Sequence, residues 1–119
     1  RLYNLKPLKL IKMDIEKVTI EVPVQKFEVY HKDCKFKLEH DDAVKYCGRL
    51  DGGWRLPTRK EQLEMHEHKE ELGLDDGAYW SSTELNGYSN YAWGCYFSNG
   101  NFFNCLKFRT YRVRAVKTI

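Results

Sequence analysis

The feature that most constrains the fold is the composition of the last third of the chain, residues 79–116. This stretch contains five of the six Asn, five of the eight Tyr and two of the three Trp residues, and after Glu84 the chain has no Asp or Glu. Asn99-Gly100 is the strongest short signal for a β-hairpin. We therefore predict a run of antiparallel strands at residues 79–83, 92–97, 101–108 and 112–116. Aromatic and small polar side chains with few charges are also typical of a binding surface.

The rest of the chain is expected to form the scaffold of a single domain at residues 15–119, a length that can bury a core without metals or disulfides. Residues 1–14 mix Leu and Lys with one Pro, and we expect a linker or an arm that docks on a neighbour. The alternation of apolar and polar residues over 18–22 predicts a half-buried strand that ends at Pro23. Residues 27–30 predict a second short strand.

Two helices are predicted next. The first is expected to be capped by Asp41 or Asp42 and to end at the glycines 52–53. Its expected buried face consists of Ala43, Cys47 and Leu50.

The second helix is predicted over residues 59–72, because Thr58 and Glu61 match a capping box and Gly73 suits the end of a helix. This helix is mostly polar, so we expect it to lie on the surface. Its apolar contacts are expected from Leu63, Met65 and Leu72. The order strand, strand, helix, helix and then a run of strands is typical of an α+β domain.

Three segments carry a resemblance to a known family: GGWRLPTRKEQL at 52–63, YWSSTE at 79–84 and YRVRAV at 111–116. In this order they resemble the C-type-lectin-fold domains of bacteria and bacteriophages. The likeness is greatest to the variable proteins of diversity-generating retroelements and their non-variable, bacterial cell-surface relatives. The resemblance implies a C-type lectin-like fold, with two helices packed on a twisted antiparallel sheet, and a location on a phage particle or a bacterial cell surface. Lys117 stands where the family usually has Arg.

In that family a retroelement mutates adenines, and the mutated AAY codons cannot encode Glu, Gln, Lys, Met or Trp. These five types make up 27 of the residues 1–84 but only two, Trp93 and Lys107, of the 28 residues 85–112. The depletion fits a diversified segment, although sheet and turn segments are also poor in Glu, Lys and Gln. The resemblance implies a ligand-binding variable region at about 80–114, and we predict contacts from both aromatic and polar side chains. They are Asn86, Tyr88, Asn90, Tyr91, Tyr96, Ser98, Asn101, Phe103, Asn104, Phe108, Arg109 and Thr110.

We expect about half of these twelve residues to be exposed, because strands alternate between two faces. The scaffold beneath them is expected to bury its three tryptophans, Trp54, Trp80 and Trp93. We also expect an internal ion pair between Arg114 and Glu84.

The predicted function is therefore non-catalytic, calcium-independent binding of an unknown protein or cell-surface ligand, without a cofactor or a metal. A fixed bacterial cell-surface or pilus-type interaction domain is the alternative on the same fold. A calcium-dependent sugar-binding lectin is less favoured, because its loops need carboxylates that the chain lacks after Glu84. Oligomerisation is left open. We expect no membrane insertion, since no apolar run reaches the roughly 18 residues that a membrane helix needs.

Two further alternatives concern the cysteines. Cys95 and Cys105 invite comparison with the formylglycine-generating enzymes, which share the fold and use paired cysteines, or they could form a disulfide across the hairpin. Cys34 and Cys47, with His31 and His40, match no common zinc spacing. All four cysteines could form two disulfides or none.

The net charge of +3 is unevenly distributed, since residues 85–119 carry five Lys or Arg and no acid. A basic face with aromatics can bind nucleic acid. Five cations over this length produce only a modest field, so no nucleic-acid partner is expected.

Overall fold

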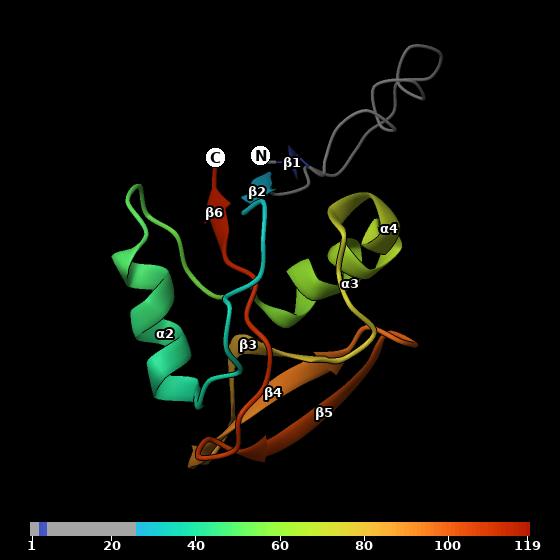
Figure 1. Cartoon of the computed structure of the whole chain (residues 1–119). Helices are drawn as coiled ribbons and strands as arrows, with labels where there is room; N and C mark the ends of the chain where they lie inside the picture. Colours follow the sequence, from blue (N-terminus) through green and yellow to red (C-terminus); the bar gives the residue numbers. More distant parts are fainter. Residues whose placement is uncertain (1–2, 5–25) are drawn as a thin grey trace.

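A computed structural model describes residues 3–4 and 26–119 (Figure 1). Most of the arm predicted at 1–14, and the strand predicted at 18–22, lie outside the described residues. Tyr3–Asn4 forms strand β1, which pairs antiparallel with β2 (Phe27–Val29), and β2 pairs antiparallel with β6 (Val116–Thr118). This small sheet, ordered β1-β2-β6, joins segments from the two ends of the chain.

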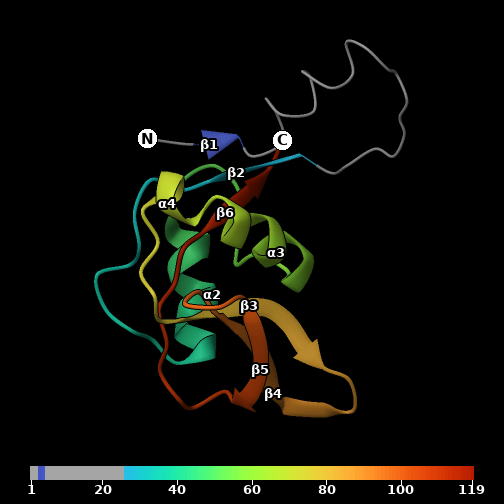
Figure 2. The ribbon, with the colours of Figure 1, turned by 90° about the vertical axis from the view of Figure 1, so that its right-hand side faces the viewer.

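The second sheet is the β-meander that the composition of the last third predicts. It consists of β3 (Ala78–Leu85), β4 (Tyr88–Tyr96) and β5 (Asn101–Leu106), which pair antiparallel in that order. Figure 2 shows α3 between this sheet and the small one. The predicted Asn99-Gly100 turn is confirmed: the Gly100 amide donates to the Tyr96 carbonyl at 2.7 Å.

Several of the predicted strand boundaries are wrong. Strand β3 continues two residues beyond the predicted end at 83, and β5 ends two residues before the predicted end at 108. Strand β4 begins four residues earlier than expected, because Gly87, with φ 84°, closes a short turn that pairs Leu85 with Tyr88. The strand expected at 112–116 is an extended, mostly buried segment instead, and β6 begins only at its last residue. The carbonyl groups of this segment accept from scattered amides, such as that of Cys34, instead of forming one ladder.

The first helix, α2, spans His40–Arg49 and differs from the prediction at both ends. Neither predicted capping aspartate caps it: Glu39 is the N-cap residue, and no side chain hydrogen-bonds there. Asp41 and Asp42 lie in the first turn, where their charges favour the helix dipole. The helix ends before the glycines 52–53, which adopt positive φ in the following turn. Ala43 and Cys47 are buried as predicted, whereas Leu50 is half-buried at the C-cap.

The second predicted helix is interrupted. It consists of α3 (Arg59–Glu67) and the short α4 (Lys69–Leu72), separated by His68 with φ −112° and ψ 24°. The capping box is confirmed in both directions: the Glu61 amide donates to Thr58 Oγ1 at 3.1 Å, and the Thr58 amide donates to Glu61 Oε1 at 2.9 Å. Gly73 ends α4 with φ 66°, as predicted.

Helix α3 docks on the sheet partly through polar groups, which the sequence did not indicate. Leu63, predicted as a contact, is 52% exposed, whereas Glu61 and Gln62 are buried. Gln62 Nε2 donates to the backbone carbonyls of Tyr79 and Trp80, at 3.3 and 3.2 Å. The position of α3 is thus fixed by directional bonds as well as by apolar packing.

The buried side chains form two clusters. One lies between the small sheet, helices α3 and α4, and the adjoining part of the meander, and it consists of Phe27, Val29, Met65, Leu72, Leu74, Tyr79, Cys95, Phe97 and Val116. The other packs α2 and residues 111–116, which we call the final segment, against the meander. It consists of Ala43, Cys47, Trp54, Leu56, Trp80, Ala92, Val113 and Ala115. Among the described residues, no helix has the length and apolarity needed to cross a membrane.

Candidate ligand-binding surface

The meander is held in place by Trp80, whose side chain is fully buried. Its Nε1 donates to the Leu38 carbonyl at 2.8 Å. Its ring meets the rings of Tyr111 and His40 edge-on, at centroid distances of 4.8 and 5.0 Å. Trp80 therefore links the first strand of the meander to α2 and to the final segment.

Gly94, which lies opposite Phe103 in the β4–β5 ladder, allows β4 to pack closely against its two neighbouring strands. An added Cβ at this position would lie 2.5 Å from the Phe103 ring and 2.8 Å from the Tyr79 carbonyl oxygen. Only hydrogen fits there, so β4 can lie close to both neighbours.

Trp93 points toward α3, where the guanidinium group of Arg59 stacks on it. The Arg59 Cζ lies 3.9 Å from the Trp93 ring centroid and 4.6 Å from that of Phe102. Trp54 and Trp80 are buried as predicted, but Trp93 is only half-buried, which corrects that prediction. Its exposed edge is covered by a cation instead of by apolar side chains.

The predicted ion pair between Arg114 and Glu84 is wrong. Arg114 is 3% exposed, and its Nε donates to Asp33 Oδ1 at 2.7 Å. Glu84 instead accepts from Lys107 Nζ at 2.6 Å, and this hydrogen bond lowers the pKa of the Glu84 carboxyl. The Arg114 guanidinium also donates to three backbone carbonyls, those of Tyr30, Leu72 and Gly73.

None of the twelve predicted contact residues is buried. Ten are exposed, and Tyr91 and Phe103 are half-buried, so the expectation that only about half would be exposed is wrong. They do not form one continuous patch, because β4 and β5 run antiparallel and place them at opposite ends of the hairpin. Asn104 lies between the two groups, opposite Trp93.

The larger group, which we call the hairpin-end surface, lies where β4 begins and β5 ends. The Lys107 amide donates to the Asn90 carbonyl at 2.9 Å, which brings the segment after β5 beside the start of β4. A hollow of about 340 Å³ there is lined by residues that include Asn90 and Phe108. The hairpin-end surface consists of Asn86, Tyr88, Asn90, Tyr91, Phe108, Arg109 and Thr110.

The smaller group, the turn-end surface, lies at the β4–β5 turn. Here Tyr96 contacts Phe103 at a ring distance of 4.6 Å, and Phe103 contacts Tyr111 at 5.0 Å. Tyr111 in turn packs on Trp80, so the exposed ring is supported by a row of rings that reaches the core. The turn-end surface consists of Tyr96, Ser98, Asn101 and Phe103.

The four cysteines are free thiols. The strand register places Cys95 opposite Phe102 and Cys105 opposite Ala92, so the two cysteines are not cross-strand partners. Burial raises the pKa of Cys95 to about 11, so its reactive thiolate is scarce at neutral pH. The Tyr111 hydroxyl donates to Cys105 Sγ at 3.4 Å.

No metal-binding group is formed by the described residues, among which no three His, Cys, Asp or Glu side chains converge. His40, one of the four residues considered for zinc, is buried, and its Nε2 lies 2.9 Å from the Ser81 carbonyl oxygen. Burial lowers the pKa of His40, so at neutral pH its ring is uncharged and Nε2 donates. His31, in contrast, is exposed.

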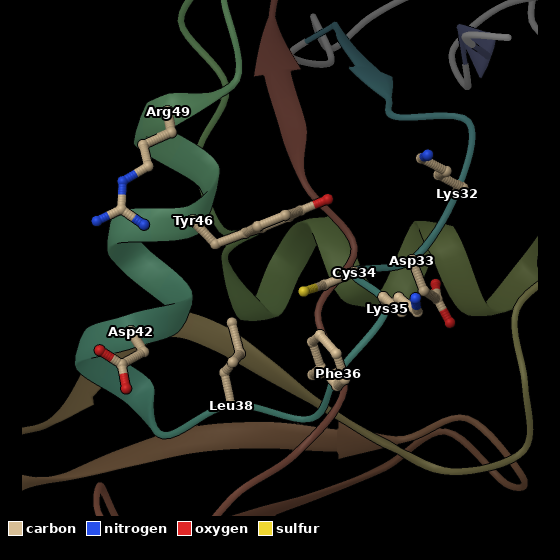
Figure 3. Close-up of a pocket in the computed structure, with 9 residues that line it drawn as sticks. All are labelled: Lys32, Asp33, Cys34, Lys35, Phe36, Leu38, Asp42, Tyr46 and Arg49. Carbon is tan, nitrogen blue, oxygen red and sulfur yellow. The ribbon is translucent and has the colours of Figure 1, made fainter.

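Sequence reasoning missed a second hollow, lined by residues 32–38 and by α2 (Figure 3). The sequence signal is the run of residues 32–36, which contains two lysines, Lys32 and Lys35, and the apolar Cys34 and Phe36. Such short runs commonly belong to solvated loops, so this run alone does not indicate a pocket.

Residues 25–117 match the family described as the Lcl C-terminal domain. No curated protein matches the chain. The matched region includes both sheets apart from β1 and the last strand residue, and all of the described helices. The α+β arrangement is the C-type lectin-like fold that the sequence predicts. The chain belongs to the Lcl C-terminal domain family.

Proposed function

We propose that the chain is a non-catalytic ligand-binding domain that recognises a protein or cell-surface ligand through its hairpin-end surface. One observation carries the proposal: Tyr88 and Phe108 are 59% and 62% exposed at the same end of the meander. Large exposed aromatic side chains provide contact area at a small cost in conformational entropy. The neighbouring Asn90 and Arg109 provide hydrogen bonds and charge for specificity.

The frame beneath this surface supports the proposal, because its contacts do not depend on the exposed side chains. The ion pair between Glu84 and Lys107 links β3 to the end of β5. The Lys107 amide also donates to the Asn90 carbonyl of β4. Trp80 fixes β3 from the other side. Exposed residues can therefore change without loss of the strand register.

The finer part of the proposal is that the surface is diversified by a retroelement and displayed on a phage particle or bacterial cell surface. It rests on the resemblance and on the depletion of five residue types in 85–112. A near-identical template repeat downstream of the coding DNA, differing only at adenines, would support diversification. Its absence would favour a fixed interaction domain with the same binding surface.

The binding proposal is tested with fluorescently labelled protein on intact bacterial cells. The double variant Tyr88→Ser/Phe108→Ser should lose most of the cell binding, and chelation of calcium should leave wild-type binding unchanged. Leu63→Ser is the matched control, because Leu63 is similarly exposed but lies on α3. Equal loss in the control, or full binding by the double variant, would contradict the proposal.

A further inference from the structure

The hollow between α2 and residues 32–38 is separate from the hairpin-end surface and has the form of a small-molecule pocket. Its volume is about 720 Å³, within the roughly 300–1,000 Å³ typical of ligand pockets. Figure 3 shows the ring of Tyr46 extending from α2 toward this segment, near Cys34. The remaining apolar lining comes from Phe36 and Leu38.

Phe36 is the residue that the fold does not use. Its side chain is 65% exposed, the largest exposed fraction among the exposed large hydrophobic residues of the described chain. The only ring contact found for it in the described residues is a cation, Lys35 Nζ, 5.7 Å from the ring centroid. An aromatic side chain in this position can stack on a ligand without disturbing the core.

The charges at the rim are predominantly positive. Lys32, Lys35 and Arg49 line the hollow, and none of them has an acidic partner among the residues that the structure describes. Of the two lining acids, Asp33 is already engaged: it accepts from Arg114 Nε and from the Tyr79 hydroxyl, each at 2.7 Å.

Asp42 is therefore the one lining acid left to oppose the three cations. No described residue forms a hydrogen bond with the Tyr46 hydroxyl. This hydroxyl is therefore available to donate to a ligand in the hollow. Burial raises the pKa of Tyr46, so this hydroxyl keeps its proton. Apolar walls, unpaired cations and a free hydroxyl donor complement an apolar group that carries a carboxylate.

We infer that this pocket binds a small apolar carboxylic acid, with the ring or alkyl group between Phe36 and Tyr46 and the carboxylate at the lysines. A carboxylate forms an ion pair with the ammonium group of Lys and accepts a hydrogen bond from a phenol hydroxyl. This inference does not depend on the function proposed for the hairpin-end surface, because the two sites share no residue.

The probe is phenylacetate, titrated into the full chain labelled with ¹⁵N. Saturable amide shifts are expected within residues 32–49. Two comparison compounds separate the contributions: phenylacetamide has the same shape without the charge, and acetate has the charge without the ring. Phenylacetate should bind at least about fivefold more tightly than either, a difference of about 1 kcal/mol.

Variants then locate the site. Phe36→Ser should weaken phenylacetate binding about tenfold and Lys35→Gln about threefold, in line with one lost apolar contact and one exposed charge. Phe108→Ser is the matched control, since Phe108 is exposed to a similar degree at the other site, and it should leave the affinity unchanged. Both replaced residues of the pocket are exposed, so the variants are expected to fold, and unfolding curves check this.

Three results would overturn the inference: no saturable shifts, equal affinity for phenylacetamide, or equal weakening by Phe108→Ser. A failure here would leave the cell-binding test of the hairpin-end surface unaffected. A failure of the cell-binding test, with full binding by the double variant, would likewise leave the inference about the pocket unaffected.

Discussion

Arg109 and Arg114 lie close together in the sequence but in two different regions of the molecule. Arg114 is buried, and it ties Asp33 and three backbone carbonyls to the final segment. Arg109 is exposed, and no described side chain is its partner. The same residue type thus stabilises the fold at position 114 and is exposed on the binding surface at position 109. The difference lies in burial and in satisfied hydrogen bonds, not in composition.

The largest expected effect comes from removing the buried arginine. Arg114→Ala leaves the Asp33 carboxylate without its charge partner and three carbonyls without a donor. We expect a loss of about 3–5 kcal/mol in the free energy of unfolding. Denaturant titration measures it, and Arg109→Ala, expected to change stability by less than about 0.5 kcal/mol, is the matched control. Similar losses in both variants would remove the contrast between the two regions.

The next effect concerns the close approach at Gly94. Gly94→Ala inserts a methyl group against the Phe103 ring and the Tyr79 carbonyl, and the carbonyl belongs to a paired strand that cannot withdraw. We expect destabilisation by about 1–3 kcal/mol. Gly48→Ala should have the opposite sign and stabilise by about 0.5–1 kcal/mol, because Gly48 is helical and an added Cβ meets nothing within 4 Å. A neutral Gly94 variant would show that the strands are less closely packed than described.

A smaller effect is expected at the start of α3. Thr58→Ala removes the acceptor for the Glu61 amide, and we expect a loss of about 1 kcal/mol. Thr110→Ala, at an exposed position of the hairpin-end surface, serves as the control. Thermal unfolding of the two variants side by side measures the difference, and equal midpoints would argue against the capping role.

The smallest expected effect is a dependence on pH through His40. Burial lowers its pKa below the ordinary value of 6.5, and Nδ1 is buried without a partner, so the folded state favours the neutral ring. The stabilisation is therefore complete above pH 6.5 and is lost as the pH falls through the lowered folded pKa. His40→Gln should flatten the stability profile measured between about pH 7.5 and about pH 5. An unchanged profile would contradict this assignment.

Local signals in the sequence were enough to predict the capping box at Thr58, the helix end at Gly73 and the turn at Asn99-Gly100, because each depends on residues that are neighbours in the chain. The same rule applies to Asn86-Gly87, which closes the β3–β4 hairpin, so the sequence also carries a local signal for the early start of β4. The interruption at His68 is not marked by Gly or Pro and has no such signal.

Long-range pairs could not be predicted in this way. Asp33 and Arg114 meet only because the final segment runs beside residues 30–34, and nothing in the sequence assigns that acid to that arginine. The exposure of the twelve contact residues likewise depends on how the meander is covered. Both of its faces are partly covered by the rest of the fold. The antiparallel pairing of β4 and β5 divides these residues into two groups.

The central claim is that the frame keeps its stability when the hairpin-end surface is replaced. The most direct measurement is the free energy of unfolding of a variant in which six exposed residues of this surface become Ser together: Asn86, Tyr88, Asn90, Phe108, Arg109 and Thr110. We expect cooperative unfolding within about 1.5 kcal/mol of the wild type, because such surface changes are individually small. A loss as large as that of Arg114→Ala, or no cooperative transition, would contradict the account.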